Sequence, residues 1–203
     1  ALLLARTAAA RGALLLNHCE TVALLREGPP GAAQVRGLVV RDRETGTETR
    51  VRARCVVNAT GVWVDAVRDM DRDEGAPHRP PMVAPSQGVH LIVDRRFLPG
   101  SHALLVPKTD DGRVMFAVPW YGKTILGTTD TPRHDLAREP APFADEVSFI
   151  LEQAGRYLLH APQRADVRSI WVGLRPLVKP SGEDGENTKA LSREHTVIVG
   201  RSG

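Results

Sequence analysis

Three short stretches of this sequence hold the groups that could do chemistry. His90 stands at the start of a predicted strand, within Ser86–His90, where an imidazole could take a proton or donate a hydrogen bond to a substrate. Arg175 lies among apolar residues in Trp171–Leu177, and its planar guanidinium suits a carboxylate or phosphate. Asn58–Gly61 separates an apolar run from a predicted helix, an order that aims backbone N–H groups at an anion.

Each stretch also has a simpler interpretation that the sequence leaves open. Asn58–Gly61 could be an ordinary turn between a strand and a helix, because a lone Gly turn is weak evidence of a binding loop. His90 could be a structural histidine held by packing and hydrogen bonds. Arg175 could pair with Asp130 inside the fold instead of binding a ligand.

Composition and charge exclude several other classes of function. Hydrophobic residues make up 42% of the 203 residues and charged residues 25%, which is typical of a globular protein with a core. The net charge is 27 − 24 = +3, and the basic residues are spread along the chain, so nucleic-acid binding is not favoured. The two cysteines and seven histidines show no metal-ligand spacing, which predicts no metal site. The sequence contains no run of about 18 apolar residues, so it predicts no membrane span.

The elements that must position these residues differ between the two parts of the chain. In the first part the patterns predict a helix ending near Ala10, then strands over 13–16 and 21–26. A hairpin over 35–43 and 47–55 follows, with a short apolar strand at 55–57 and a helix over 62–70. Residues 69–81 are rich in charge, Gly and Pro and indicate a crossing between domains.

The second part predicts an antiparallel or mixed sheet with one long helix. Strands are expected over 89–93, 103–106, 114–118, 124–127, 166–178 and 196–199. The helix is expected over 143–160, where apolar residues recur at helical spacing and Asp145 and Glu146 suit the helix dipole in the first turn.

Five blocks of sequence, taken together and in order, resemble the FAD-dependent glycerol-3-phosphate dehydrogenases, which belong to the D-amino-acid-oxidase-like flavoenzymes. The resemblance covers nearly the whole chain. GTTDT and GLRPLV separate this family from its amino-acid-oxidising relatives, whereas NATG is shared with many of them. The blocks are NATG-W at 58–63, GVH at 88–90, PW-x₅-LGTTDT at 119–131, W-x-GLRPLV at 171–178 and SREH at 192–195.

The resemblance implies an α/β to α+β fold. A partial FAD-binding, Rossmann-like domain is expected at 1–75, a mixed-sheet substrate-binding domain with flanking helices at 76–185, and a return strand to the FAD domain at 186–203. The implied reaction is FAD-dependent oxidation of sn-glycerol 3-phosphate to dihydroxyacetone phosphate, with electrons passed to quinone. The implied location is cytoplasmic, peripheral on the inner face of the cytoplasmic membrane.

The same resemblance assigns residues to roles. His90 and Arg175 are expected to be catalytic, with His90 near the reacting carbon. Arg175 and Arg193 are expected to contact the substrate or its phosphate. The residues expected to contact FAD are Asn58, Ala59, Thr60, Gly61 and Trp63.

The sequence departs from the family in ways that predict an incomplete enzyme. The GxGxxG fingerprint, which the family carries ahead of these motifs, does not occur in the chain, and the flavin-side motif expected after the last strand is also missing. We therefore expect these 203 residues alone to be inactive. Gln87 stands where relatives commonly carry Lys, which weakens any argument about charge beside His90. The alternatives are an oxidase of the same substrate, an amino-acid oxidase of the same group and a folded, non-catalytic module.

Overall fold

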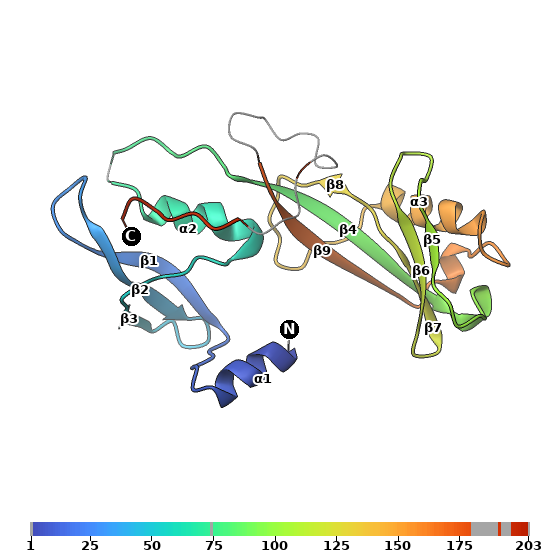
Figure 1. Cartoon of the computed structure of the whole chain (residues 1–203), viewed down its shortest axis with the longest axis horizontal. Coiled ribbons are helices and arrows are strands. Elements are labelled where there is room, and N and C mark those ends of the chain that lie inside the picture. Colours follow the sequence, from blue (N-terminus) through green and yellow to red (C-terminus); the bar gives the residue numbers. More distant parts are fainter. Residues whose placement is uncertain (1, 74, 180–190, 192–195, 203) are drawn as a thin grey trace. The chain divides into compact units, whose positions relative to one another are not determined.

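The computed structural model describes residues 2–73, 75–179, 191 and 196–202 (Figure 1). The chain divides into two compact units. The first unit contains Ala1–Thr60, Val64–Pro80 and Val197–Gly203, and the second contains Gly61–Trp63 and Pro81–Thr196. No helix in the described part of the chain is long and apolar enough to cross a membrane.

The first unit is a small antiparallel sheet with two helices. Helix α1 (Leu2–Ala10) precedes strands β1 (Cys19–Glu27), β2 (Gln34–Asp42) and β3 (Glu48–Arg52), which pair in that order. Helix α2 (Val64–Met70) follows. The carboxylate of Asp71, just after α2, accepts a 2.5 Å hydrogen bond from the Ser202 hydroxyl and lies 3.5 Å from the Arg26 guanidinium of β1. These contacts tie the end of the chain and α2 to this sheet.

The second unit is built on one long strand. Strand β4 (Val83–Asp94) pairs along most of its length with β9 (Ser169–Val178), and the two run side by side in Figure 1. On its other side β4 pairs first with β8 (Thr131–Pro132) and then with β7 (Lys123–Gly127). Strands β6 (Met115–Trp120) and β5 (Leu104–Val106) continue the sheet, and every pairing between the described strands is antiparallel.

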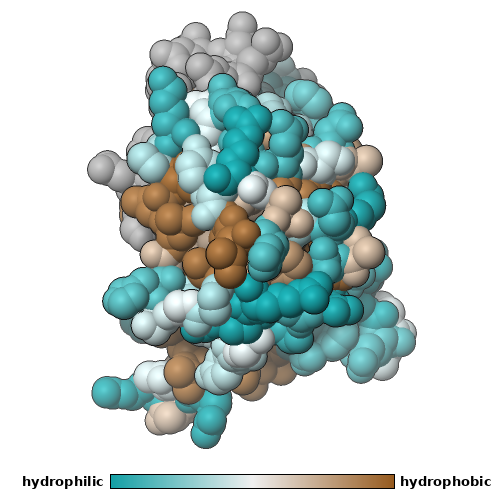
Figure 2. Space-filling view, turned by 90° about the vertical axis from the view of Figure 1, so that its right-hand side faces the viewer, coloured by the Kyte–Doolittle hydropathy of each residue, from teal (hydrophilic) through white to brown (hydrophobic). Residues whose placement is uncertain are grey.

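One face of this sheet carries the core, because alternate side chains of β4 point to opposite faces. Val89, Leu91 and Val93 are fully buried against Val147 and Ile150 of helix α3 (Ala144–Gly155). Short 3₁₀ turns η1 (Gly61–Trp63), η2 (Arg95–Phe97) and η3 (Arg164–Asp166) complete the unit. Figure 2 shows hydrophobic surface between hydrophilic side chains on the face of the molecule that lies at the right of Figure 1.

The structure contradicts three of the predicted strands. Residues 13–16, 55–57 and 196–199 form no strand, because none of these segments has a pairing partner among the described residues. Their apolar side chains stay exposed, as at Leu14, Val57 and Val197. The long helix is also shorter than predicted: α3 ends at Gly155 instead of 160, where Gly155 packs closely against Ala161.

Candidate active site

The two predicted catalytic residues lie on the same face of the sheet, opposite helix α3. Ser86 of β4 pairs with Arg175 of β9, and His90 pairs with Trp171, so these side chains alternate with the buried Val89 and Leu91. The structure therefore brings together, from two neighbouring strands, the two residues that the sequence analysis expects to be catalytic.

Arg175 reaches across β4 by passing over Gly88. A Cβ atom built on Gly88 would overlap the guanidinium, so only glycine leaves room for it. Beyond Gly88 the guanidinium donates to the backbone oxygen of Thr129 at 3.0 Å and to the hydroxyl of Thr128 at 2.9 Å. These bonds fix the plane of the guanidinium against the segment Thr128–Asp130, which connects β7 to β8.

His90 is held beside Arg175 by packing. Its ring lies against Gly127 of β7, where a Cβ would come within 2.5 Å of the imidazole Cδ2, and its centroid is 5.5 Å from the Trp171 ring. Its Nδ1 is buried and has no hydrogen-bond partner among the described residues. Burial, and then the positive charge of Arg175, lower the pKa of His90 below its ordinary value of 6.5. The imidazole is therefore neutral at pH 7 and able to accept a proton.

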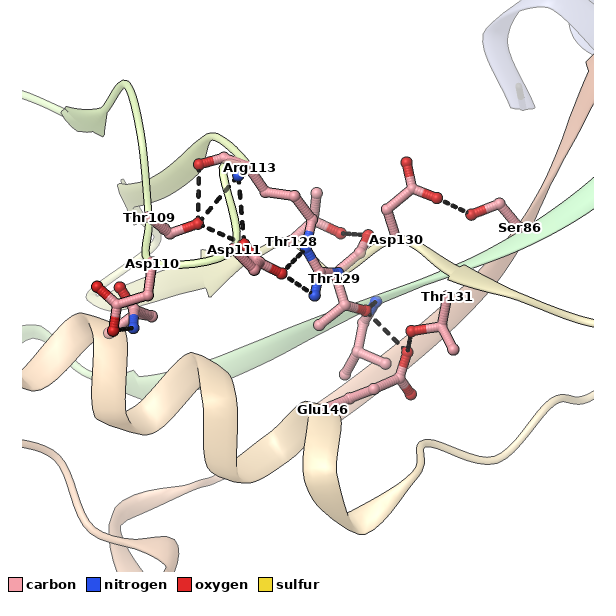
Figure 3. A network of polar contacts seen from close by, with 12 residues as sticks. Ser86, Thr109, Asp110, Asp111, Arg113, Thr128, Thr129, Asp130, Thr131 and Glu146 are labelled. Atoms are coloured by element: carbon pink, nitrogen blue, oxygen red, sulfur yellow. Dashed lines mark hydrogen bonds and ion pairs between the residues drawn. The ribbon is translucent and has the colours of Figure 1, made fainter. Parts of the chain in front are cut away.

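The connecting segment is fixed from the opposite face of the sheet by Glu146, in the first turn of α3 (Figure 3). The Glu146 carboxylate accepts hydrogen bonds from the hydroxyls of Thr129 at 2.9 Å and Thr131 at 2.7 Å. It also accepts one from the backbone N–H of Phe143 at 2.9 Å. The sequence placed Glu146 only as a helix-dipole partner, and Thr128 and Thr129 only inside a family motif. The spacing of Glu146 three residues after Phe143 was the available signal, because a Glu there can cap the helix.

Gln87 belongs to this second face, which corrects its predicted place beside His90. Successive residues of a strand point in opposite directions, so Gln87 faces α3 while His90 faces the other way. Its amide donates to Glu146 at 2.6 Å and accepts from the Arg133 guanidinium. Gln87 is fully buried, and its identity therefore bears on the charge around Glu146 and not on the charge beside His90.

The predicted FAD contacts fall in the segment that links the two units. In the first unit, the Asn58 amide donates to the backbone oxygen of Val64 at 2.9 Å, and the Thr60 hydroxyl donates to Asn58 at 2.8 Å. In the second unit, Gly61 begins η1 with a positive φ of 62°, and a Cβ atom built on it would meet no other atom within 4 Å. Turn η1 packs against β4 and β9, and the Trp63 indole donates to the Leu136 oxygen at 3.3 Å.

Two further expectations concern charged partners of the site. Arg193 lies outside the described residues. Asp130, the alternative partner of Arg175, accepts a hydrogen bond from the Ser86 hydroxyl, while Arg175 donates to Thr128 and Thr129.

Comparisons with known proteins agree with the motifs. The chain is 42% identical to the mitochondrial glycerol-3-phosphate dehydrogenases of Rattus norvegicus and Homo sapiens, over 100% of the chain and 27% of each relative. It is 40% identical to that of Schizosaccharomyces pombe, over 98% of the chain and 32% of the relative.

A solved structure, the glycerol-3-phosphate dehydrogenase from Bacillus halodurans complexed with FAD, superimposes with a TM-score of 0.72 at 37% identity, over 85% of this chain and 33% of that one. The chain thus spans about a third or less of the length of these relatives. The predicted resemblance and fold class are confirmed. A family model described as FAD dependent oxidoreductase matches residues 1–202, and the chain therefore belongs to this family of flavoenzymes.

Proposed function

We propose that this chain carries the substrate-binding face of an FAD-dependent dehydrogenase that oxidises sn-glycerol 3-phosphate to dihydroxyacetone phosphate. One observation carries the proposal most directly. A guanidinium held in one plane over Gly88 lies on the same face as a neutral, half-buried histidine. A fixed guanidinium suits a phosphate, and a neutral imidazole suits a hydroxyl that must lose its proton.

Each residue then has a part in the reaction. Arg175 binds the phosphate and so fixes the distance between C2 of the substrate and the guanidinium. His90 accepts the proton of the C2 hydroxyl as the C2–H bond breaks. The hydrogen of C2 leaves with two electrons, and the flavin of bound FAD supplies the acceptor for that hydride. The ketone forms when the electron pair of the O–H bond becomes the second C–O bond.

The residues proposed to contact FAD fit a cofactor that needs close access to the backbone. Gly61 has a left-handed backbone and open space where a side chain would be. Asn58 hydrogen-bonds both Thr60 and the backbone of Val64, so these bonds hold the backbone conformation of the segment that we propose contacts the cofactor. We propose that Asn58, Ala59, Thr60, Gly61 and Trp63 line the FAD site, and that residues 1–75 and 186–203 belong to the FAD-binding domain while 76–185 bind substrate.

We further propose that quinone accepts the electrons, at the inner face of the cytoplasmic membrane. The support is the resemblance in GTTDT at 127–131 and GLRPLV at 173–178 to dehydrogenases of this kind. A comparison of a soluble quinone with oxygen as acceptor for the FAD-loaded holoenzyme tests this. Rapid turnover with oxygen and none with quinone would make the enzyme an oxidase.

The substitution Arg175→Lys in the FAD-loaded holoenzyme tests the phosphate assignment. Lysine keeps the positive charge but loses the planar, bidentate geometry, and a lost charged hydrogen bond costs about 1.5–3 kcal/mol. We expect kcat/KM for glycerol 3-phosphate to fall by about one to two decades. Arg168→Lys is the matched control, because Arg168 lies just before β9 and its largely exposed guanidinium pairs with Asp94. Unchanged kcat/KM in Arg175→Lys would remove Arg175 from the site.

A further inference from the structure

Glu146 is a buried carboxylate whose bonds converge from several directions. Its exposed fraction is 5%, and it lies on the sheet face opposite His90 and Arg175. It accepts hydrogen bonds from the Thr129 and Thr131 hydroxyls (Figure 3). It also accepts hydrogen bonds from the Gln87 amide and the Phe143 backbone N–H. Capping of α3 accounts for the bond from Phe143 alone. Of the other three, one comes from Thr129 in the segment that joins β7 to β8, and one comes from Thr131, the first residue of β8.

Thr129 links this carboxylate to the candidate phosphate anchor. Its hydroxyl has one proton, which it donates to Glu146 at 2.9 Å, and its oxygen accepts the backbone N–H of Val89 at 3.0 Å. Both bonds hold the side chain on the α3 face. The backbone oxygen of the same residue accepts the Arg175 guanidinium at 3.0 Å on the opposite face. The bonds of the Thr129 hydroxyl to Glu146 and Val89 therefore restrict the position of the residue whose backbone oxygen orients Arg175.

The segment depends on these side-chain bonds because it interrupts the backbone ladder of the sheet. Strand β7 ends its pairing with β4 at Gly127, and β8 begins again at Thr131. Between them Val89 donates to a side-chain hydroxyl in place of a backbone oxygen. The anchors at Thr129 and Thr131 thus lie on either side of Asp130 and both end on Glu146.

We propose that Glu146 is a positioning residue for substrate binding. Through the hydroxyls of Thr129 and Thr131 it holds the backbone oxygen that orients the Arg175 guanidinium toward the substrate phosphate. This inference rests on the proposed function, in which Arg175 binds that phosphate.

The test uses Glu146→Gln in the FAD-loaded holoenzyme. Glutamine keeps the volume but replaces one acceptor by an NH₂ group that faces other donors, so the connecting segment shifts. We expect the KM for glycerol 3-phosphate to rise about tenfold with a smaller change in kcat. Gln153→Ala is the matched control: Gln153 is a buried residue of the same helix, and its amide bonds Asp110 instead of this segment. It should lower Tm without raising KM.

A double-mutant cycle with Arg175→Lys decides whether Glu146 acts through Arg175. We expect Glu146→Gln to raise KM far less in the Arg175→Lys background than in the native one, because the guanidinium is already gone. If the two substitutions raise KM by independent factors that multiply, the role of Glu146 is overturned while the proposed function stands. The same holds if Glu146→Gln lowers Tm without changing KM. An unchanged KM in Arg175→Lys by itself would overturn the proposed function, and the role of Glu146 with it.

Thr131→Val provides a milder variant in case Glu146→Gln does not fold. Valine removes only the 2.7 Å bond to the carboxylate and keeps the shape of the side chain. A KM raised about twofold to fivefold at nearly unchanged Tm supports the proposal. An unchanged KM contradicts it.

Discussion

His90 and Arg175, which we propose bind the same substrate, also influence each other through charge. Burial is the main reason that the pKa of His90 is lowered, and the Arg175 guanidinium lowers it further. A lowered pKa means that the imidazole stays neutral at more acidic pH, so proton acceptance persists on the acidic side of neutrality.

The pH dependence of kcat/KM tests this coupling in the FAD-loaded holoenzyme. Arg175→Gln removes the positive charge, so the pKa of His90 should rise toward its ordinary value of 6.5, although burial still holds it down. The acidic limb of the profile should therefore move to higher pH. Arg175→Lys keeps the charge and should leave the limb in place. The substrate phosphate titrates equally in all three enzymes, so only the difference between profiles counts. A limb that stays in place in Arg175→Gln would show that His90 is not the group that titrates.

At the scale of the element, the glycine in the middle of strand β4 leaves the room that the Arg175 side chain needs to cross the strand. A glycine in a strand usually weakens the strand. Here the missing side chain of Gly88 lets the Arg175 side chain of β9 extend over β4 to its other edge. The paired residue Gly173 of β9 has no atom within 4 Å of a built Cβ. The two glycines are therefore paired in the sheet, but the Arg175 guanidinium covers Gly88 while the Cβ position of Gly173 is open.

Gly88→Ala and Gly173→Ala form a matched pair for the FAD-loaded holoenzyme. The new methyl group at position 88 overlaps the end of a flexible side chain, so the strand survives but the Arg175 guanidinium must move. We expect the KM for glycerol 3-phosphate to rise about tenfold in Gly88→Ala, with Tm within a few degrees of native. Gly173→Ala should change neither. Equal KM values for the two variants would show that Arg175 does not act from this position.

Turn η1 offers a test of the cofactor contact that keeps the backbone intact. Gly61→Val would strain the positive φ whether or not a cofactor approaches. Asparagine tolerates φ near 62° and still adds a side chain in the open space at Gly61. We expect Gly61→Asn in the complete enzyme to fold with an unchanged circular dichroism spectrum but to lose most of its bound flavin. Full flavin occupancy would place the cofactor elsewhere.

Patterns within one element, or between two strands joined by a short turn, were predictable from the sequence, and contacts between elements distant in the sequence were not. The hairpin of β2 and β3 and the apolar face of α3 follow from residue periodicity and turn chemistry. The apolar runs at 13–16, 55–57 and 196–199 look like strands, but a strand also needs a neighbour, which periodicity does not supply. The roles of Gly88 and Glu146 depend on which residues face each other across β4, β9 and α3, and this follows only from the register.

At the scale of the molecule, the two units differ in how much they bury. The second unit has a continuous core of twelve buried residues between α3 and the sheet. In the first unit the described residues of β1 to β3 include Val35 as their one buried large hydrophobic residue. Leu14, Leu16 and Val57 stay mostly exposed there. An apolar surface of this kind favours association or instability.

The 203 residues purified alone should therefore be colourless, without dehydrogenase activity and only marginally stable in the first unit. The sequence has no GxGxxG turn, which in dinucleotide-binding folds supplies the pyrophosphate site at a helix N-terminus. The residues around Asn58 can then contribute only part of a flavin surface. A titration with excess FAD, followed by flavin fluorescence, should show no tight binding. Hydrogen exchange provides the internal control, because amides of β4 should be protected while those of β1 to β3 exchange quickly. Stoichiometric FAD binding with turnover of glycerol 3-phosphate would contradict this expectation, and uniformly rapid exchange would show that the second unit does not fold by itself.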